Sequence, residues 1–538
     1  MVNYYGLSII KNCLYVLIVE RKGVCYYLYM ALEEIRSERI KKLERLEKAG
    51  IDIFPASVSK SREEIGAVLK NFAKRIRLTP RLRSGGKRGV VVAGRLFAKR
   101  EHGGSCFGDL KDASGKIQVF FKEDVLGKDS YDLFIRDIDI GDFLEVSGKP
   151  FVTKRGEQTI EVLEWRILAK SLRPLPEKWH GLQDVEERFR KRYLDLLMNE
   201  EVRQKFLARS RIIRDLRGFL EKNGFEEFET PMLQSIPGGA LAKPFKTHHN
   251  ALDVDLYLRI APELYLKRLL VGGFEKVYEL GRDFRNEGID VTHNPEFTML
   301  EVYAAWWDEN DMMKFVEEMF LNAVAKIFKK KEFEYDGSKV AIKAPFPRVT
   351  FADLLKKYAL IVDYDAETRD SMALIARRFG LDVEKHESKG KIADEIYKKI
   401  CRPHLKNPVF VVSHPLDISP LAKKISKNSN NVRRFQLIVG GLEIANGFSE
   451  LNDPIDQKAR FEEQEKMRGG GSPSQILHGK TWEGEEEAHP MDEDFVEALE
   501  YGMPPAAGLG VGIDRLIMLL TNTHNVKEII LFPTMRSK

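Results

Sequence analysis

The sequence predicts an α+β protein in which a small five-stranded β-barrel precedes a larger domain, built on an antiparallel β-sheet that is flanked by helices and carries a helical insertion. Three observations indicate this fold. Short β-rich runs separated by turn residues recur between residues 89 and 168. A strand, a loop and a returning strand follow one another between residues 277 and 303. Apolar residues recur at helical spacing through most of residues 311–403.

The composition is that of a soluble globular protein with a polyanionic partner. The 538 residues are 31% charged with a mean hydropathy of −0.33, and their number suggests two to four domains. The net charge is only +5, but eleven Lys or Arg and no Asp or Glu lie between Lys70 and Arg100. This stretch favours a nucleic-acid partner, with a solvated charged linker as the alternative. The four cysteines form no C-x-x-C pair, so a structural zinc is not expected and a reducing cytoplasm fits.

Residues 1–29 differ from the rest of the chain. They are rich in Tyr, Val, Leu and Ile, but charged residues interrupt the apolar run well short of a membrane span. A signal-peptide cleavage pattern is not evident either, so no membrane segment is expected. Because the likeness to known sequences given below starts only after Met30, we expect residues 1–29 to be a non-native extension, which detection of these residues in the native protein would refute.

Residues 30–87 are predicted to form a basic helical segment. Its first part, residues 31–49, suits a basic amphipathic helix with apolar positions at Ile35, Ile40, Leu43 and Leu46.

Five β-rich runs predict an OB-type barrel over residues 88–170. The runs cover residues 89–96, 106–110, 116–121, 142–152 and 159–168, a spacing typical of this barrel. OB barrels bind single-stranded nucleic acid through aromatic stacking and basic tracks. A proline-containing linker at residues 171–192 then leads to the larger domain at residues 193–538, whose helical insertion spans about residues 311–403.

The segment Phe284–Thr298 places polar donors beside an aromatic ring, in the loop of a predicted hairpin. Arg285 offers a planar fork that suits phosphate oxygens, and Phe297 offers a flat surface for a purine. The segment therefore predicts a nucleotide site, although an isolated Arg-x-Glu is more often a salt bridge at a sheet edge. Alternation along the returning strand predicts one polar and aromatic face and one packing face; the first carries Phe297, Met299, Glu301 and Tyr303, and the second carries Thr298, Leu300, Val302 and Ala304.

A glycine-rich segment strengthens this interpretation. Gly508, Gly510 and Gly512 alternate with apolar residues and run into a helix predicted to start near Asp514. The backbone can therefore approach a ligand closely, and Arg515 lies in a first helical turn. Together with Arg285 and residues 293–297, this segment resembles motifs 2 and 3 of the class II aminoacyl-tRNA synthetases. Residues 206–231, a helix followed by an extended run that ends in Pro231, resemble motif 1.

The more specific resemblance is to the bacterial-type lysyl-tRNA synthetase family. It rests on residues 180–196, 236–274 and 446–454 and extends from about Glu33 to the C-terminus. It implies a class II catalytic domain that activates L-lysine with ATP to lysyl-adenylate and pyrophosphate and transfers lysine to the 3′ end of tRNA(Lys). It also implies a cytoplasmic homodimer with Pro231 at its interface. The barrel would bind the anticodon, with contacts at Phe107, Gln118 and Glu157.

The implied ATP site depends on charge and stacking, and a general base is not needed. The attacking carboxylate of lysine is already ionised, so positioning and stabilisation of phosphate charge suffice. The resemblance assigns the α-phosphate to Arg285, the γ-phosphate to Arg515 and the phosphate tail to His293, which are the predicted catalytic residues. Further ATP contacts are implied for Phe297, which stacks on adenine, and for Glu287, Asn294 and Glu443.

A second predicted hairpin, at residues 436–443, suggests a site for Mg²⁺. With Gly440–Gly441 as a two-residue turn, residue 438 faces 443, and Gln436 lies diagonally from Glu443 on the same face. Both residues, with Glu450 as a further candidate, are predicted to share Mg²⁺ with the ATP phosphates. The family pattern has a glutamate where Gln436 stands, so one ion is expected to bind more weakly or to depend more on ATP. A hairpin with plain surface polar residues is the alternative.

The side-chain ammonium of lysine requires anions in a closed pocket, because an uncompensated buried charge is costly. Glu263 and Glu450 are the candidate anions, with Glu301 and Tyr303 beside them. A carboxylate at position 263 also suits a helix start. The resemblance adds Gly239 as the contact to the substrate's amino group, and Asn446 and Phe448 as further pocket residues.

Strict alternation would place Glu443 and Glu450 on opposite faces of their strand, so a β-bulge is expected around residues 445–447. The adjacent His248 and His249 suggest zinc only weakly, because partner ligands are missing from the sequence around them. Residues 469–487 are expected to form a flexible loop without an assigned function.

Three other functions are compatible with parts of the sequence. A lysine-activating paralogue that modifies a protein such as elongation factor P lacks the N-terminal barrel, so residues 89–168 favour tRNA. An aspartyl- or asparaginyl-tRNA synthetase shares the architecture, but two glutamates around the pocket would repel an aspartate side chain. A nonenzymatic single-strand-binding protein would leave Arg285, Glu443 and Arg515 without a purpose.

Overall fold

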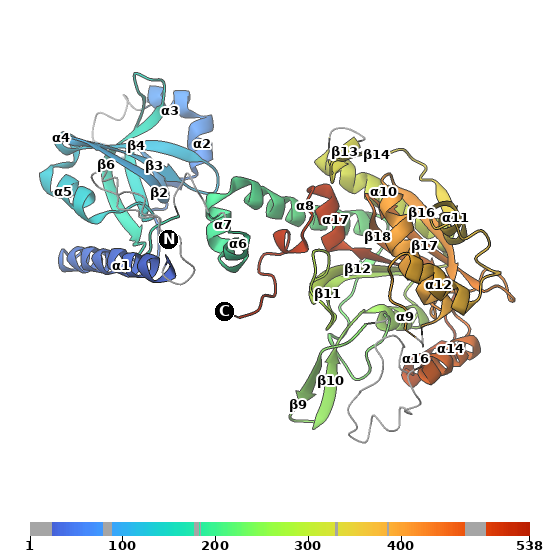
Figure 1. The fold of residues 1–538 in the computed structure, drawn as a ribbon. Helices are drawn as coiled ribbons and strands as arrows, with labels where there is room; N and C mark the ends of the chain where they lie inside the picture. Colours follow the sequence, from blue (N-terminus) through green and yellow to red (C-terminus); the bar gives the residue numbers. More distant parts are fainter. Residues whose placement is uncertain are drawn as a thin grey trace, which may run out of the picture. The chain divides into compact units, whose positions relative to one another are not determined.

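The computed structural model describes residues 24–78, 89–176, 182, 184–240, 242–328, 332–384, 387–467 and 491–537. The chain forms two compact units, residues 1–181 and 182–538 (Figure 1). Residues 1–23 of the expected N-terminal extension and the whole of the expected loop at 469–487 lie outside the described residues. Part of the basic stretch, residues 79–88, lies outside them as well.

The first unit contains the predicted barrel, and all five predicted strands are confirmed. Its six-stranded sheet has the order β1-β2-β3-β4-β6-β5, and pairing of β2 with β5 closes it. The strands are β1 (Arg62–Glu63), β2 (Val90–His102), β3 (Ser105–Lys111), β4 (Lys116–Lys122), β5 (Phe143–Val152) and β6 (Gln158–Ala169). Two helices that were not predicted, α4 (Glu123–Leu126) and α5 (Lys128–Asp137), lie between β4 and β5.

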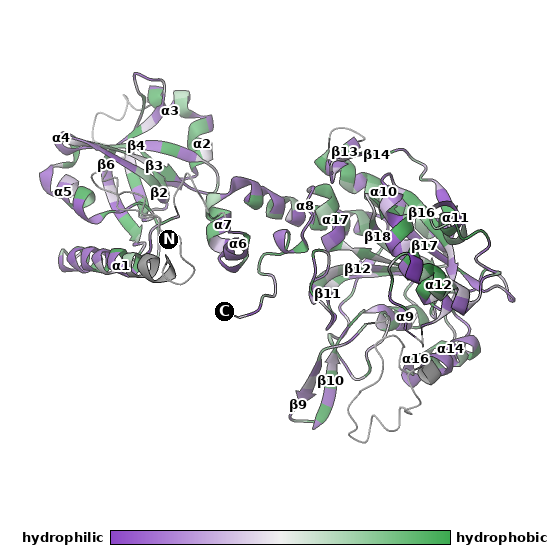
Figure 2. Ribbon diagram, in the orientation of Figure 1, coloured by the Kyte–Doolittle hydropathy of each residue, from purple (hydrophilic) through white to green (hydrophobic). Residues whose placement is uncertain are grey.

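Three helices precede β2: α1 (Val24–Lys48) comes before β1, and α2 (Ile65–Lys70) and α3 (Phe72–Leu78) follow it. The predicted amphipathic helix is confirmed within α1, and Figure 2 shows α1 largely in the hydrophilic colour. Leu46 is fully buried, but the prediction for Ile35 is wrong, because this side chain is 37% exposed. Arg39 is buried instead, and its guanidinium donates hydrogen bonds to the carbonyls of Ser171, Arg173 and Ile140.

An eight-stranded sheet forms the centre of the second unit (Figure 1). Its order is β15-β16-β17-β18-β19-β12-β11-β7, antiparallel except where β15 and β7 join the two ends in parallel. The strands are β7 (Glu226–Glu227), β11 (Lys276–Phe284), β12 (Glu296–Ala305), β15 (Arg348–Thr350), β16 (Val409–Pro415), β17 (Asn431–Val439), β18 (Leu442–Ser449) and β19 (Ala506–Gly512).

One face of this sheet packs against helices. Leu300, Val302 and Ala304 are fully buried there, as alternation along β12 predicts. They belong to one core with residues of α8 (Glu200–Lys222), α10 (Glu309–Ile327) and α17 (Ile513–Leu520). The opposite face of β12 therefore remains for a ligand.

The predicted helical insertion is only partly helical. Three of its predicted helices are confirmed as α11 (Phe351–Tyr358), α12 (Arg369–Arg378) and α13 (Lys389–Ile396), and they share a core with β16. The fourth corresponds to α10, which instead packs in the main core. A hairpin of β13 (Glu332–Tyr335) and β14 (Ser338–Ala341) was not predicted; its turn, Asp336–Gly337, has positive φ at both residues, and this Asp-Gly pair is a hairpin signal in the sequence.

Shorter elements complete the second unit. They are α6 (Val185–Arg190), which falls within the predicted linker, α7 (Arg192–Met198), a three-stranded sheet of β8 (Leu233–Gln234), β9 (Lys246–His249) and β10 (Val254–Leu258), and the helices α9 (Glu263–Val271), α14 (Pro454–Met467) and α16 (Glu493–Glu500). Over the ranges that the structure describes, every helix is too short or too polar to span a membrane.

Candidate active site

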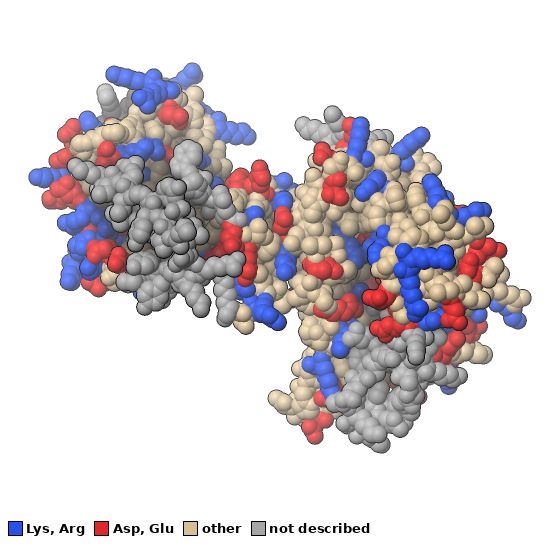
Figure 3. Space-filling view, in the orientation of Figure 1, with Lys and Arg blue, Asp and Glu red and all other residues tan. Residues whose placement is uncertain are grey.

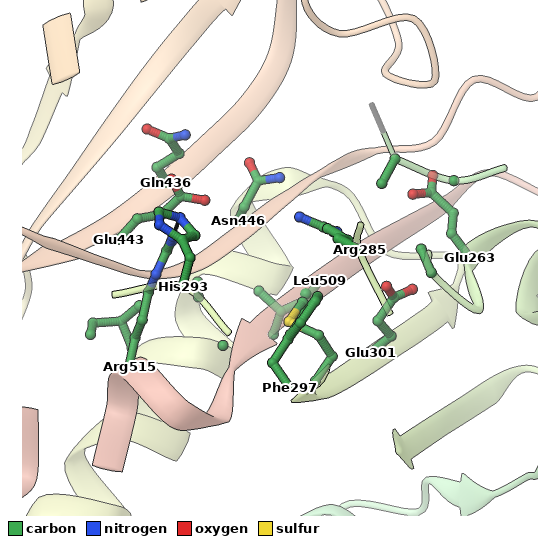
Figure 4. Close-up of a pocket in the computed structure, with 18 of the residues that line it drawn as sticks. Glu263, Arg285, His293, Phe297, Glu301, Gln436, Glu443, Asn446, Leu509 and Arg515 are labelled. Atoms are coloured by element: carbon green, nitrogen blue, oxygen red, sulfur yellow. Dashed lines mark hydrogen bonds between the residues drawn. The ribbon is translucent and has the colours of Figure 1, made fainter. Parts of the chain in front are cut away.

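A cavity of about 440 Å³ opens on the free face of the main sheet, and most of the predicted site residues line it (Figure 4). Its walls come from the β11–β12 and β17–β18 hairpins, from β19, and from the starts of α9 and α17. The predicted residues that line it are Gly239, Glu263, Arg285, Glu287, His293, Asn294, Phe297, Glu301, Tyr303, Gln436, Glu443, Asn446, Phe448 and Arg515. Of the residues predicted to bind ATP, metal or lysine, Glu450 does not line it.

The β11–β12 hairpin supplies an arginine and an aromatic ring. The guanidinium carbon of Arg285 lies 5.0 Å from the centroid of the Phe297 ring. The buried Nε of Arg285 has no hydrogen-bond partner among the described residues, so it is free to donate to a ligand. Asn294 is held by a 2.7 Å hydrogen bond from Nδ2 to the carbonyl of Glu296. Glu287 is exposed at the cavity edge.

Arg515 and His293 meet across the cavity, and a third residue that sequence reasoning missed orients them. Arg515 Nη2 donates to His293 Nε2 at 3.1 Å, so His293 carries its proton on Nδ1 and donates it to Asp290 Oδ2 at 2.7 Å. Asp290 also accepts from the backbone N–H groups of Thr292 and His293. Partial burial opposes ionisation of Asp290, but these hydrogen bonds hold its pKa at about 2. An aspartate two residues before a threonine in a loop is a turn signal that could have indicated this role.

The β17–β18 hairpin has the predicted turn and, next to the turn, the predicted pairing. Gly440 and Gly441 both have positive φ, and Ile438 pairs with Glu443. The expected bulge exists one residue earlier than predicted: Leu437 pairs with Ala445, so Ile444 is the extra residue. Beyond it, Asn446 and Phe448 face the cavity with Glu443.

Gln436 and Glu443 present oxygen atoms to the same part of the cavity. Gln436 is 3% exposed and lines the cavity, with His414 as a side-chain neighbour. The Glu443 carboxylate lies 4.0 Å from Arg402 Nη1. When ATP phosphates supply some of its ligands, Mg²⁺ needs only one or two oxygen ligands from the protein. One carboxylate and one amide oxygen fit this requirement. In the described ranges, no group of three or more His, Cys, Asp or Glu is arranged to hold a metal ion. His248 and His249 are exposed and belong to no such group.

The predicted lysine-binding glutamates are joined by a residue that the sequence did not single out. Lys267, on α9, lies with its ammonium 2.6 Å from Glu263 Oε1 and 2.5 Å from Glu450 Oε2. Glu450 is therefore not proposed as a magnesium ligand, because its Oε2 already contacts an ammonium group at the Glu263 end of the site. Burial raises the pKa of Glu450 to about 8 although Lys267 lowers it.

Glu450 nevertheless lies directly behind the cavity wall. A Cβ atom on Gly508, a wall residue, would stand 2.1 Å from Glu450 Oε1. Tyr303 lies beside it and donates a 2.8 Å hydrogen bond to Glu301 Oε2. Burial raises the pKa of both Glu301 and Tyr303. Gly239 closes this end with a φ of +86°, where a Cβ atom would meet Glu263 Cβ at 2.9 Å.

Comparison with known proteins decides the family. Residues 184–536 match the family described as tRNA synthetases class II (D, K and N), and residues 90–168 match the OB-fold nucleic acid binding domain. The chain belongs to the class II tRNA synthetases. Lysine–tRNA ligases of Carboxydothermus hydrogenoformans and Moorella thermoacetica are each 47% identical to it, over 95% and 94% of this chain and 99% of their own length. The lysine–tRNA ligase of Enterococcus faecalis is 47% identical over 83% of this chain and 87% of its own length.

In this class II synthetase, two of the three predicted anticodon residues share the outer face of the OB unit. Phe107 stacks on its cross-strand partner Phe120, with ring centroids 4.4 Å apart. Gln118 belongs to the same face by register and accepts a 2.9 Å hydrogen bond from Thr159 Oγ1. Glu157 is exposed in the turn between β5 and β6. Figure 3 shows Lys and Arg side chains that project from the upper edge of this unit, on the side of α3.

Proposed function

We propose that this chain is a lysine–tRNA ligase, which activates L-lysine with ATP and transfers it to the 3′ end of tRNA(Lys). The observation that carries the proposal is one cavity in which two arginines, an aromatic ring and a cluster of glutamates meet. Two arginines suit a triphosphate, and the glutamates suit an ammonium group. The lysine–tRNA ligases that match nearly the full chain support the same function.

In the first step, a carboxylate oxygen of lysine attacks the α-phosphorus of ATP, and the bond to pyrophosphate breaks. Arg285 would stabilise the charge that grows on the α-phosphate, and Phe297 would hold adenine. Arg515 and His293 would hold the pyrophosphate end, with Asp290 fixing the His293 tautomer that accepts from Arg515. In the second step, the terminal ribose hydroxyl of the tRNA attacks the carbonyl carbon of lysyl-adenylate, and AMP leaves.

Glu443 and Gln436 would hold Mg²⁺, which neutralises phosphate charge when it is bound. Glu443 brings a full negative charge and Gln436 only an amide dipole, so this pair attracts a cation less strongly than two carboxylates. The binding of the metal is therefore expected to depend strongly on the nucleotide.

Lysine itself would lie between Gly239 and Gly508. Glu450 Oε1 is buried and has no hydrogen-bond partner among the residues described, and it is directed at the glycine wall. An ammonium group from the substrate would satisfy it, with Tyr303, Glu301 and Glu263 around it. Asn446 and Phe448 would complete the pocket beside the aliphatic part of lysine.

The partners follow from the same proposal. The OB unit would bind the anticodon of tRNA(Lys) through Phe107, Gln118 and Glu157. A homodimer would use the motif 1 region, where Pro231 is exposed next to Met232 and Leu233, which are 47% and 48% exposed. The cytoplasm is the expected compartment, since Cys106 and Cys401 are free and buried.

ATP–pyrophosphate exchange with each amino acid in turn tests the function. Lysine alone should stimulate exchange, and tRNA(Lys) alone should accept it; stimulation by aspartate or asparagine would contradict the proposal. Glu450→Gln should sharply weaken lysine binding and preserve ATP binding, whereas Glu318→Gln, the same change on the exposed side of α10, should alter neither. Equal loss of both ligands in Glu450→Gln would refute the assigned pocket.

A further inference from the structure

A lysine side chain of the protein itself lies behind the anionic end of the cavity, against Glu263 of the wall. Lys267 is fully buried, and its ammonium bridges Glu263 and Glu450 at 2.6 and 2.5 Å. Two aromatic rings also surround this ammonium: the centroid of Phe448 lies 5.4 Å away and that of Phe495 lies 5.9 Å away. Charge, hydrogen bonds and cation–π contacts therefore hold Lys267 in one place.

The two carboxylate oxygens of Glu450 have different neighbours. Oε2 forms an ion pair with Lys267, and Oε1 lies against Gly508 in the cavity wall. Lys267 also takes Oε1 of Glu263, a residue that lines the cavity directly. When both carboxylates are ionised, they and the one ammonium together carry a single negative charge at this end of the cavity.

We propose that Lys267 is a positioning and specificity-determining residue, which fixes Glu263 and Glu450 and leaves one uncompensated negative charge for the side-chain ammonium of the substrate. The inference rests on the proposed function. Without Lys267, two buried carboxylates would face one another with no cation between them, and one of them would hold its proton up to a higher pH than in the wild-type protein. A neutral pocket would then bind lysine weakly and would no longer reject an uncharged side chain of similar length.

Protonation of Glu450 gives this role a distinctive pH signature. Among the described residues, the titratable groups that interact with Glu450 are Lys267 and Glu263 on α9 and Tyr303 on β12. Burial raises the Glu450 pKa to about 8, and Lys267 opposes this rise. Because lysine requires the ionised form, kcat/KM for lysine should fall as the pH drops through this range, and loss of Lys267 should move the fall to higher pH.

Lys267→Met, which keeps the length and removes the charge, tests the inference by ATP–pyrophosphate exchange. At a pH at which Glu450 is ionised in the wild-type protein, the lysine KM should rise at least about tenfold, which corresponds to the loss of one charge-assisted hydrogen bond, and the ATP KM should stay within about twofold. The preference for lysine over methionine should fall. The part of the pH profile over which kcat/KM for lysine decreases, here called the pH limb, should shift to higher pH. Lys267→Arg keeps the charge and should leave the pH limb in place.

Lys170→Met is the matched control. Lys170 is also a buried lysine between two carboxylates, Asp139 and Asp142 at 2.7 Å each, but it belongs to the barrel. Its replacement should leave amino-acid activation unchanged. The inference is wrong if Lys267→Met keeps the wild-type pH limb, if it weakens lysine and ATP equally, or if Lys267→Arg shifts the limb as far as Lys267→Met does. Failure of the wild-type protein to activate lysine would instead refute the proposed function.

Discussion

Replacement of Gly508 by alanine should damage the lysine pocket and spare the ATP site. The new Cβ atom would stand 2.1 Å from Glu450 Oε1 and 2.5 Å from Tyr303 Cε1, and both side chains are buried and cannot swing into solvent. The Glu450 carboxylate must therefore move away from the wall. Loss of its charge-assisted hydrogen bond to the substrate ammonium costs about 1.5–3 kcal/mol, which raises the lysine KM roughly 10- to 150-fold.

Gly510→Ala provides a control on the same strand. Its Cβ atom would meet only the flexible end of Met299, at 3.2 Å, and the carbonyl of Asn446, at 3.8 Å. The KM values for lysine and ATP are measured for both variants by ATP–pyrophosphate exchange. A lysine KM in Gly508→Ala equal to that of the wild type, or equal to that of Gly510→Ala, would refute the placement of Glu450 behind this wall.

Three further predictions concern other parts of the chain. Gln436→Glu adds a carboxylate beside Glu443 and should lower the Mg²⁺ concentration needed for half-maximal ATP binding in calorimetric titrations; an unchanged concentration would contradict the metal assignment. Phe107→Ala removes a stacking surface worth about 1–3 kcal/mol per base, so the KM for tRNA(Lys) should rise about tenfold or more in aminoacylation while ATP–pyrophosphate exchange is unaltered. Burial, together with Arg434, lowers the pKa of His414 from 6.5 to about 3. Between these two pH values only the unfolded chain binds a proton at His414, so the native protein should lose stability as the pH falls from 6.5 towards 3. His414→Leu should flatten this loss in denaturant unfolding at several pH values, and an unchanged pH dependence would exclude His414 as its source.

The periodicity of apolar residues and the residues typical of turns predicted most of the fold. Alternation along residues 299–304 correctly separated the ligand face of β12 from its core face, whereas Thr298, predicted on the packing face, lines the cavity. The Gly440–Gly441 pair correctly predicted the turn and the pairing of Ile438 with Glu443. These predictions succeed because a strand that is buried on one face specifies its register strongly. The same reasoning required a bulge before Glu450, and only its position, at Ile444, differed by one residue.

The errors concern side chains whose environment depends on tertiary contacts. Ile35 suited the apolar stripe of its helix, but Arg39 is buried in its place because three backbone carbonyls are available to its guanidinium. Lys267 is one lysine among many in the sequence, and it acquires a role only when α9 brings it between Glu263 and Glu450. Asp290 likewise acquires its role when α17 carries Arg515 to His293. Pairing between distant segments determines these positions, and local periodicity carries no information about it.

A crystal structure with lysine and a non-hydrolysable ATP analogue tests the central claim most directly. We expect the side-chain ammonium of lysine within hydrogen-bond distance of Glu450 Oε1, adenine against Phe297, and the phosphates between Arg285 and Arg515. Lysine bound with its side-chain ammonium away from Glu450, or a nucleotide that contacts neither arginine, would contradict the account.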